Sequence, residues 1–257
     1  MPFPFDTFQI DDGWQMGIGD WEPNAKFPNG MAALADAIVS TGREAGLWLA
    51  PLIAAADSRL AHTRPELLLR NAEGNPVVSG INWGGPYYSL DPTADATADF
   101  LSELITTARS WGFSYLKLDF LYAAAFPGVH ARPMPRELAY RHAADVMRRA
   151  AGSDCYLLAC GAPVIASTGI FDGVRIGPDA AAFWEDTELA AMGDASGRGT
   201  RNAIATSSQP LWLRGAFDTD PDVVYLDRSE VNLNSRTLES LWDLARITGF
   251  VGTSDRL

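Results

Sequence analysis

The chain has 257 residues, of which 47% are hydrophobic and 20% are charged, so its length suits one large α/β domain or two small ones. Its net charge of −12 argues against a nucleic-acid partner, because an acidic surface repels phosphate groups. Residues 1–9 do not resemble a signal peptide and no apolar segment reaches membrane-spanning length, so we expect a cytoplasmic protein with no membrane partner.

The first half of the chain predicts four strands, each a short apolar run that ends near a polar or charged residue. They lie at residues 8–12, 46–50, 87–90 and 115–120, the third being the weakest. A helix with Met31 and Ile38 on its apolar face separates the first two strands. Asp91 and Thr93 are placed to cap another helix, whose apolar face spans residues 100–108.

The second half of the chain repeats this alternation of strands and helices. Strands are predicted at residues 156–160, 174–176, 210–213 and 250–253, and helices at residues 136–151, 201–207 and 238–247. The helix at 136–151 is expected to bury Leu138, Val146 and Met147.

Eight strands with helices between them predict an α/β fold of the (β/α)8, or TIM barrel, type. An open doubly wound sheet is the alternative, but the turn Asp11-Asp12-Gly13-Trp14 is not a Gly-rich phosphate-binding turn. The chain stops soon after the eighth predicted strand. We therefore expect one catalytic barrel domain over residues 1–257 that lacks the last helix.

In a barrel of this type the active site lies at the carboxyl ends of the strands. The polar residues there are mostly acids, with one tryptophan: Asp11, Asp12, Trp48, Asp91, Lys117, Asp119, Cys160, Arg175, Asp179, and Asp220 or Asp222. Carboxylates with aromatic platforms are typical of glycoside hydrolysis. The three histidines lie away from the strand ends, and a Gly-x-Ser-x-Gly motif is missing. We therefore expect neither a metal nor a cofactor.

Each candidate group also has a purely structural interpretation. Asp11 and Asp12 could cap a loop, and Lys117 and Asp119, on one face of a strand, could form an ion pair. Asp179 follows a Gly-Pro pair of the kind found in turns. Four tryptophans fit the core individually, whereas as a set near strand ends they indicate a sugar platform: Trp14, Trp21, Trp48 and Trp83.

Several motifs, in this order along the chain, resemble glycoside hydrolase family 36, which belongs to the same clan as the family 27 α-galactosidases. They are Phe8-Gln9-Ile10-Asp11-Asp12-Gly13-Trp14, Gly19-Asp20-Trp21 with Lys26-Phe27-Pro28, Gly46-Leu47-Trp48, Leu116-Lys117-Leu118-Asp119-Phe120, Cys160-Gly161-Ala162-Pro163 and Arg175-Ile176-Gly177-Pro178-Asp179. Asp220-Pro221-Asp222 and Ser254-Asp255 resemble the motifs of strands seven and eight. The resemblance covers nearly the whole chain.

The resemblance implies a retaining α-galactosidase, with Asp119 as nucleophile and Asp179 as general acid/base. The two carboxyl groups of such a pair are expected to lie about 5–5.5 Å apart. The implied substrate-binding residues are Asp11, Asp12, Trp48, Lys117, Cys160 and Arg175. The implied partners are α-galactoside oligosaccharides, and a homo-oligomer stays open.

Three other functions are compatible with parts of the pattern. A galactosyl-transferring transglycosylase would use the same residues, because hydrolysis and transfer differ in the acceptor. A non-catalytic sugar-binding chain would fit the absence, within these residues, of the β domains that usually flank the family 36 barrel. A metal-dependent aldolase would need a His or Glu ligand cluster, which the strand ends do not provide.

Overall fold

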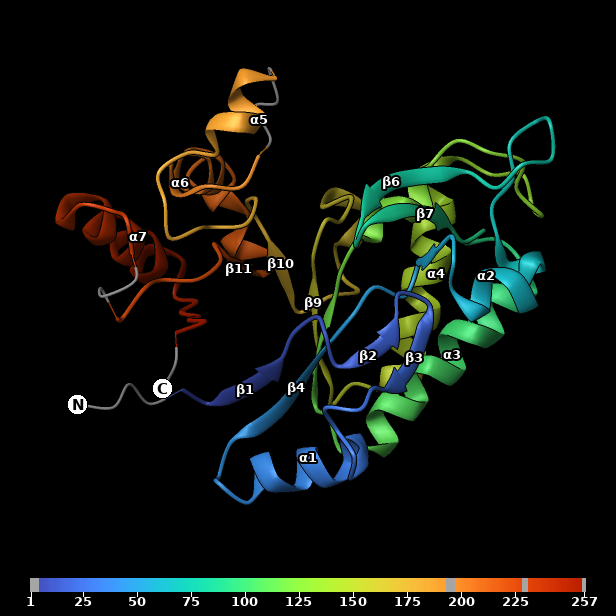
Figure 1. Ribbon diagram of the computed structural model, residues 1–257, viewed down its shortest axis with the longest axis horizontal. Coiled ribbons are helices and arrows are strands. Elements are labelled where there is room, and N and C mark those ends of the chain that lie inside the picture. Colours follow the sequence, from blue (N-terminus) through green and yellow to red (C-terminus); the bar gives the residue numbers. More distant parts are fainter. Residues whose placement is uncertain (1–4, 193–196, 228–230, 256–257) are drawn as a thin grey trace. The chain divides into compact units, whose positions relative to one another are not determined.

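The computed structural model describes residues 5–192, 197–227 and 231–255 (Figure 1). The chain divides into two compact units, Met1–Phe171 and Asp172–Leu257. A single barrel domain over residues 1–257 stays a prediction. Within the described ranges, no helix is both long enough and apolar enough to cross a membrane.

The first unit contains a parallel sheet with strand order β1-β4-β8-β9. Its strands are Thr7–Ile10, Glu44–Leu49, Tyr115–Leu118 and Tyr156–Ala159, which confirms four of the predicted strands. Gly46 allows β1 and β4 to approach, because a Cβ atom there would lie 3.0 Å from the Cβ of Gln9. The register places Trp48 beside Lys117, so both side chains reach the carboxyl end of the sheet.

The helices of the first unit include α1, α2, α3 and α4, at Gly30–Val39, Arg59–Thr63, Asp95–Ser110 and Arg136–Ala151, together with the 3-10 turns Pro65–Leu67, Leu121–Ala125 and Ile165–Ser167. Helices α3 and α4 pack against each other (Figure 1). The prediction that α4 buries Val146 and Met147 is confirmed, whereas Leu138 is 54% exposed. Leu138 is exposed because it lies in the first turn of α4, off its buried face.

The predicted cap of α3 is wrong, because Ala94 occupies the N-cap position and makes no side-chain cap bond. Asp91 is instead buried and accepts hydrogen bonds from the Thr93 and Ala131 backbone N–H groups and pairs with His130. Burial opposes the charge of Asp91, but these donors outweigh it and hold the pKa of the carboxyl below its ordinary value. Asp91 therefore ties the segment around residue 130 to the end of β7.

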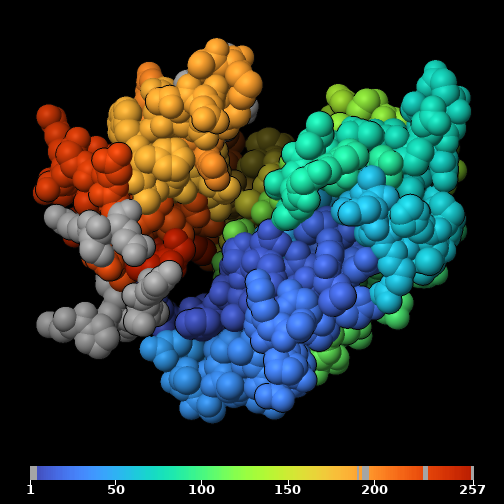
Figure 2. Space-filling model, in the orientation of Figure 1, coloured from blue at the N-terminus to red at the C-terminus, as the bar shows by residue number. Residues whose placement is uncertain are grey.

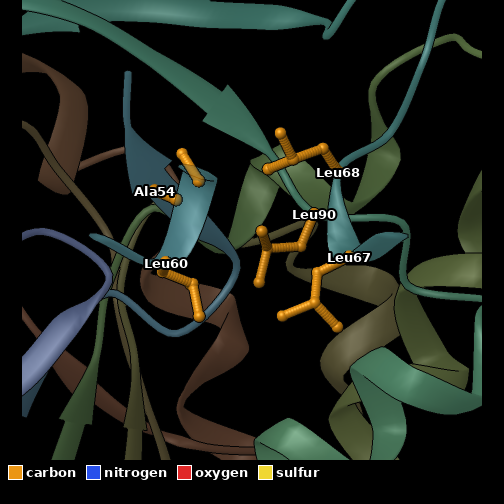
Figure 3. Packing of buried hydrophobic residues seen from close by; sticks show 6 residues of the cluster. Ala54, Leu60, Leu67, Leu68 and Leu90 are labelled. Atoms are coloured by element: carbon orange, nitrogen blue, oxygen red, sulfur yellow. The ribbon is translucent and has the colours of Figure 1, made fainter. Parts of the chain in front are cut away.

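A second, antiparallel sheet in this unit consists of β5, β7 and β6, in that order, at Ile53–Ala55, Gly85–Ser89 and Val78–Asn82. The strand predicted at residues 87–90 therefore belongs to this small sheet, and not to the barrel. Next to this small sheet lies a buried hydrophobic cluster, most of whose members Figure 3 labels: Ala54, Leu60, Ala61, Leu67, Leu68 and Leu90. Strands β2 and β3, Gln15–Gly17 and Asp20–Pro23, form a further hairpin.

The second unit contains two parallel strands, β10 and β11, at Gly173–Arg175 and Asp218–Asp220. Its helices α5, α6 and α7 span Thr187–Ala191, Thr200–Ser207 and Ser235–Thr248, and form the orange and red surfaces in Figure 2. Helix α7 buries Leu238, Leu241 and Ala245 against Val224 and Tyr225. The predictions of β10, α6 and α7 are confirmed.

Two predicted strands of the second unit are wrong. Residues 210–213 begin a 3-10 helix, Leu211–Gly215, in which Trp212 is 70% exposed, so this apolar run does not enter a sheet. In the run at 250–253, Gly252 makes only an isolated parallel bridge with Val223. The parallel strands and connecting helices of the described residues fit part of a TIM-barrel-like α/β fold, and a complete barrel stays a prediction.

Candidate active site

Asp119 lies directly after β8, where two N–H groups hold its carboxylate. Trp48 Nε1–H donates to Oδ2 over 3.0 Å, and the backbone N–H of Phe120 donates to Oδ1 over 2.7 Å. Phe120 adopts a left-handed φ of 55°, a conformation that costs energy for a bulky residue. Each carboxylate oxygen of Asp119 thus has a neutral donor, and among the described residues no Lys or Arg side chain forms an ion pair with it.

Lys117 and Asp11 form an ion pair at the same end of the sheet, with 2.8 Å between Lys117 Nζ and Asp11 Oδ2. Gln9 also donates to Asp11 Oδ2, over 2.6 Å. Burial disfavours the charged form of Lys117, but Asp11, Cys160 and Asp119 more than offset this and raise the pKa of the amine above its ordinary value. The Lys117 amine therefore interacts electrostatically with three of the predicted site residues, Asp11, Cys160 and Asp119.

Asp12 is held by side chains from two hairpins. Trp83 Nε1–H donates to Oδ2 over 2.8 Å and Gln15 Nε2–H donates to Oδ1 over 2.7 Å. Trp83 and Gly84 form the two-residue turn between β6 and β7, with φ angles of 52° and 83°. Such a turn favours Asn or Gly, so a tryptophan at its first position is strained.

An aromatic cluster surrounds these carboxylates in the first unit. The Trp83 ring lies 6.5 Å from Trp48, 5.2 Å from Phe120 and 5.8 Å from Tyr87, measured between ring centroids. The hydroxyl groups of Tyr87 and Tyr122 lie 2.7 Å apart. Trp83 is 39% exposed, whereas Trp14, Trp21 and Trp48 are buried. Of the four tryptophans, Trp83 alone presents a large exposed ring surface that could serve as a sugar platform.

In the second unit, Arg175 lies at the end of β10 and is almost wholly buried. Its Nη2 atom lies 3.0 Å from Asp179 Oδ1 and 2.5 Å from Asp222 Oδ2. The Asp179 side chain is 79% exposed, whereas that of Asp222 is largely buried. One guanidinium nitrogen therefore contacts an exposed carboxylate and a buried one.

Asp222 is the carboxylate of this group whose ionisation is most strongly perturbed. Burial raises its pKa to about 6, with the negative charges of Asp220 and Asp179 acting in the same direction and Arg175 opposing them. Burial likewise raises the pKa of Tyr225 to about 12, assisted by Asp222, Asp255 and Asp179. The second unit thus gathers several acids around a single buried arginine.

Two features of this arrangement escaped the sequence analysis. Asp222 was noted as a strand-end acid and as part of the Asp220-Pro221-Asp222 motif but was given no role, although it contacts the predicted binding residue Arg175. The β6–β7 turn was not predicted, although Asn82-Trp83-Gly84-Gly85 carries the Asn and Gly residues typical of hairpin turns. Among the described residues, no group of three or more His, Cys, Asp or Glu side chains is arranged to hold a metal ion.

A family model described as Melibiase matches residues 3–146. Among curated proteins, the chain is 33% identical over 139 residues to an A type blood α-D-galactosamine galactosaminidase of Flavonifractor plautii, which covers 50% of this chain and 13% of that protein. It is 28% identical over 149 residues to α-galactosidase AgaA of Geobacillus stearothermophilus, covering 54% and 20% of the two chains.

Among solved structures, that of TtGalA, an α-galactosidase from Thermus thermophilus, in complex with p-nitrophenyl α-D-galactopyranoside matches with a TM-score of 0.93 and 47% identity. The match covers 98% of this chain and 52% of that one. A structure of the same Thermus enzyme with stachyose matches equally well. A GH36 AgaA structure from Geobacillus stearothermophilus, at 16% identity and a TM-score of 0.64, shows the shared fold.

The chain belongs to the Melibiase family, whose model matches more than half of its length. The resemblance to glycoside hydrolase family 36 that the motifs predicted is thereby confirmed. The chain spans about half of the Thermus enzyme and a fifth or less of the two curated relatives named above.

Proposed function

We propose that this chain carries the catalytic residues of a retaining α-galactosidase that hydrolyses terminal α-galactosyl residues of oligosaccharides. Asp119 is the nucleophile and Asp179 the general acid/base. Asp11, Asp12, Trp48, Lys117, Cys160 and Arg175 bind the sugar. The family membership and the likeness to the Thermus enzyme support the reaction, and the contacts within each unit support the individual roles.

The geometry of Asp119 is the observation that carries the proposal. A nucleophilic carboxylate must stay ionised and must be fixed in orientation. Trp48 and the Phe120 backbone fix both oxygens of Asp119 through neutral N–H donors. Lys117 supplies a positive charge close by, but its bonded partner is Asp11. Asp119 is therefore oriented without being neutralised by a direct ion pair.

Asp179 has the opposite environment, which suits a group that exchanges protons. Its side chain is largely exposed, so it can take up and release a proton to water. Its hydrogen bond with Arg175 fixes one oxygen, and within the described ranges no hydrogen bond holds the other oxygen, which can face the leaving group. The separation of about 5–5.5 Å between the two carboxyl groups, expected for a retaining enzyme, stays part of this proposal.

The reaction then proceeds in two displacements. Asp119 forms a bond to the anomeric carbon while the bond to the leaving oxygen breaks and Asp179 gives that oxygen its proton. In the second step Asp179 takes a proton from water, and the water oxygen displaces Asp119 from the anomeric carbon. Two inversions give net retention. The acids Asp11 and Asp12, held by Lys117, Gln9, Trp83 and Gln15, accept hydrogen bonds from the sugar hydroxyls.

The test measures hydrolysis of p-nitrophenyl α-galactoside by this chain and by its Asp119→Gly variant, with Asp99→Gln as a control at an exposed acid of α3. We expect activity in the parent and the control, loss in Asp119→Gly, and rescue by azide with a β-galactosyl azide product. Full activity of Asp119→Gly would overturn the assignment. Galactose binding by the parent without any turnover would overturn catalysis and favour a sugar-binding role.

Adding a second sugar as acceptor separates hydrolysis from transfer, because both reactions share the covalent intermediate. We expect galactose as the main product at low acceptor concentration. A predominance of galactosylated acceptor under those conditions would identify a transglycosylase. Hydrolysis of an aryl α-galactosaminide, measured in the same way, tests whether this chain shares the substrate class named for the Flavonifractor relative.

A further inference from the structure

Asp222 makes two bonds that converge on the segment of Asp179. Its Oδ2 atom lies 2.5 Å from Arg175 Nη2 and accepts a hydrogen bond from the backbone N–H of Ala180 over 2.6 Å. Ala180 directly follows Asp179, and Arg175 also contacts Asp179 Oδ1. Asp222 therefore holds both the cation that contacts Asp179 and the peptide group that follows it.

The backbone of Asp222 adopts an uncommon conformation. Its φ of 78° lies in the left-handed region, which few residues other than glycine adopt, although aspartate and asparagine tolerate it. The backbone N–H of Asp222 donates to Asp220 Oδ1 over 2.8 Å, which stabilises the tight turn after β11. A buried carboxylate aimed at two partners from such a turn indicates a functional constraint, because burying a charge costs energy unless its partners need it.

We infer that Asp222 is a positioning residue for the general acid/base: it holds Arg175 and the Ala180 peptide, and so fixes the orientation and protonation of Asp179. This inference rests on the proposed function of Asp179. Asp222 acts through its neighbours and does not need to touch the substrate.

The charges around Asp222 determine the sign of its effect on pH dependence. Arg175 faces it as the cation, and Asp179, Asp220 and Tyr225 face it as acids or potential acids. In the ionised state Asp222 shares the positive charge of Arg175 with Asp179. Replacing Asp222 by a neutral residue removes a negative charge from the surroundings of Arg175 and Asp179, so the alkaline limb of the pH profile should move to lower pH.

The experiment compares the parent chain with Asp222→Asn, which keeps an oxygen acceptor but loses the charge, and with Asp222→Ala. The control is Asp243→Asn, which removes an exposed carboxylate that also pairs with an arginine, Arg246. Two substrates are used: 2,4-dinitrophenyl α-galactoside, whose leaving group needs little protonation, and methyl α-galactoside, whose leaving group needs a general acid.

We expect Asp222→Asn to lower kcat/KM on methyl α-galactoside about 10- to 100-fold and on the dinitrophenyl substrate less than about threefold, because general acid catalysis contributes about 10²–10⁴-fold. The alkaline limb of its pH profile on the methyl substrate should move to lower pH. In Asp222→Ala, hydrogen exchange at the Ala180 amide should accelerate, because that N–H loses its acceptor.

Equal losses on the two substrates with an unmoved alkaline limb would overturn the inference and leave Asp222 a purely structural residue. Unchanged hydrogen exchange at the Ala180 amide in both variants would show that Asp222 does not hold this peptide group, and would overturn the inference whatever the activity. An inactive parent chain would instead overturn the proposed function, so the two failures are distinguishable. If Asp222→Ala does not fold, Asp222→Asn still decides the kinetic outcome.

Discussion

The two units hold their carboxylates in different ways. In the first unit, Asp12 and Asp119 each receive two hydrogen bonds from neutral N–H donors, and Lys117 is bonded to Asp11. In the second unit, one buried arginine contacts both Asp179 and Asp222. Neutral donors orient an anion and preserve its charge, whereas a shared cation makes the ionisation of each acid depend on the other.

This difference matches the two chemical tasks in the proposed mechanism. A nucleophile and the acids that bind hydroxyls need a constant charge and a fixed direction. A general acid/base must change its protonation twice in each turnover, so coupling to a second acid through one arginine is a suitable device. Variants of the carboxylates in each unit should therefore differ in their effects on the reaction.

The largest effect is expected at Asp119 and Asp179, the proposed nucleophile and the proposed general acid/base. Asp119→Asn should lower kcat/KM about 10⁴-fold or more on every α-galactoside, because the covalent step is lost whatever the leaving group. Asp179→Asn should lower it strongly on methyl α-galactoside and far less on the dinitrophenyl substrate in the glycosylation step. Pre-steady-state kinetics separates that step from the later one. Identical leaving-group dependence in the two variants would contradict the division of roles.

Lys117→Met should have the next largest effect, because it removes the cation of the first unit while keeping the volume. We expect kcat/KM to fall about 100-fold, since Lys117 helps to hold Asp11 and lies near Asp119. The free energy of unfolding should fall by only about 1–2 kcal/mol, because Asp11 is half exposed and water can replace the lost amine.

Steady-state kinetics and urea unfolding check both parts of this prediction, with Arg149→Met as a control at an exposed cation of α4. A large loss of stability with normal activity would show that the Lys117–Asp11 pair is purely structural.

Trp83→Phe should have a smaller effect, because it keeps an aromatic ring and removes only the N–H that holds Asp12. We expect KM for the galactoside to rise about three- to tenfold, the equivalent of one hydrogen bond, with kcat little changed. Trp212→Phe, at an exposed tryptophan of the second unit, is the matched control.

Trp83→Asn should separate stability from function at the same position. Asparagine favours the left-handed conformation of this turn but loses the packing of the Trp83 ring against Trp48, Tyr87 and Phe120, so the free energy of unfolding should fall by no more than about 1 kcal/mol while KM rises further. A loss as large as that of Trp83→Val, which keeps no preference for this conformation, would contradict the strain assigned to the turn.

The smallest effect is expected from the titration of Asp222 on stability. Its pKa in the folded protein is raised to about 6, above the ordinary value of 3.8, so the folded state binds the proton more tightly than the unfolded state. The stabilising contribution is therefore present at acid pH and is lost as the pH rises through about 6. Thermal unfolding should show this as a change in the Tm of the parent minus the Tm of Asp222→Asn. That difference should be about 2–4 °C more positive at pH 4.5 than at pH 7.5. A difference independent of pH would contradict the raised pKa.

Much of the scaffold could be predicted from the sequence, because local periodicity and burial determine it. The runs that became β1, β4, β8 and β9 are apolar and short, and the helix α4 was predicted with its observed ends. The errors arose where an apolar run predicted as a barrel strand forms a different structure. Residues 87–90 pair in an antiparallel hairpin, and residues 210–213 form a 3-10 turn. Apolar character alone does not distinguish these outcomes.

The sequence by itself determined which residue types gather at the strand ends, because the alternation of strands and helices directs those ends to one edge of a parallel sheet. Motif resemblance then suggested roles for Asp119 and Asp179. Only the tertiary structure decided which groups hold them. Trp83 reaches Asp12 across 71 residues, and Asp222 reaches Ala180 across 42, both from left-handed backbone positions. Such contacts depend on strained turns that packing imposes and local propensity opposes, so a single sequence does not reveal them.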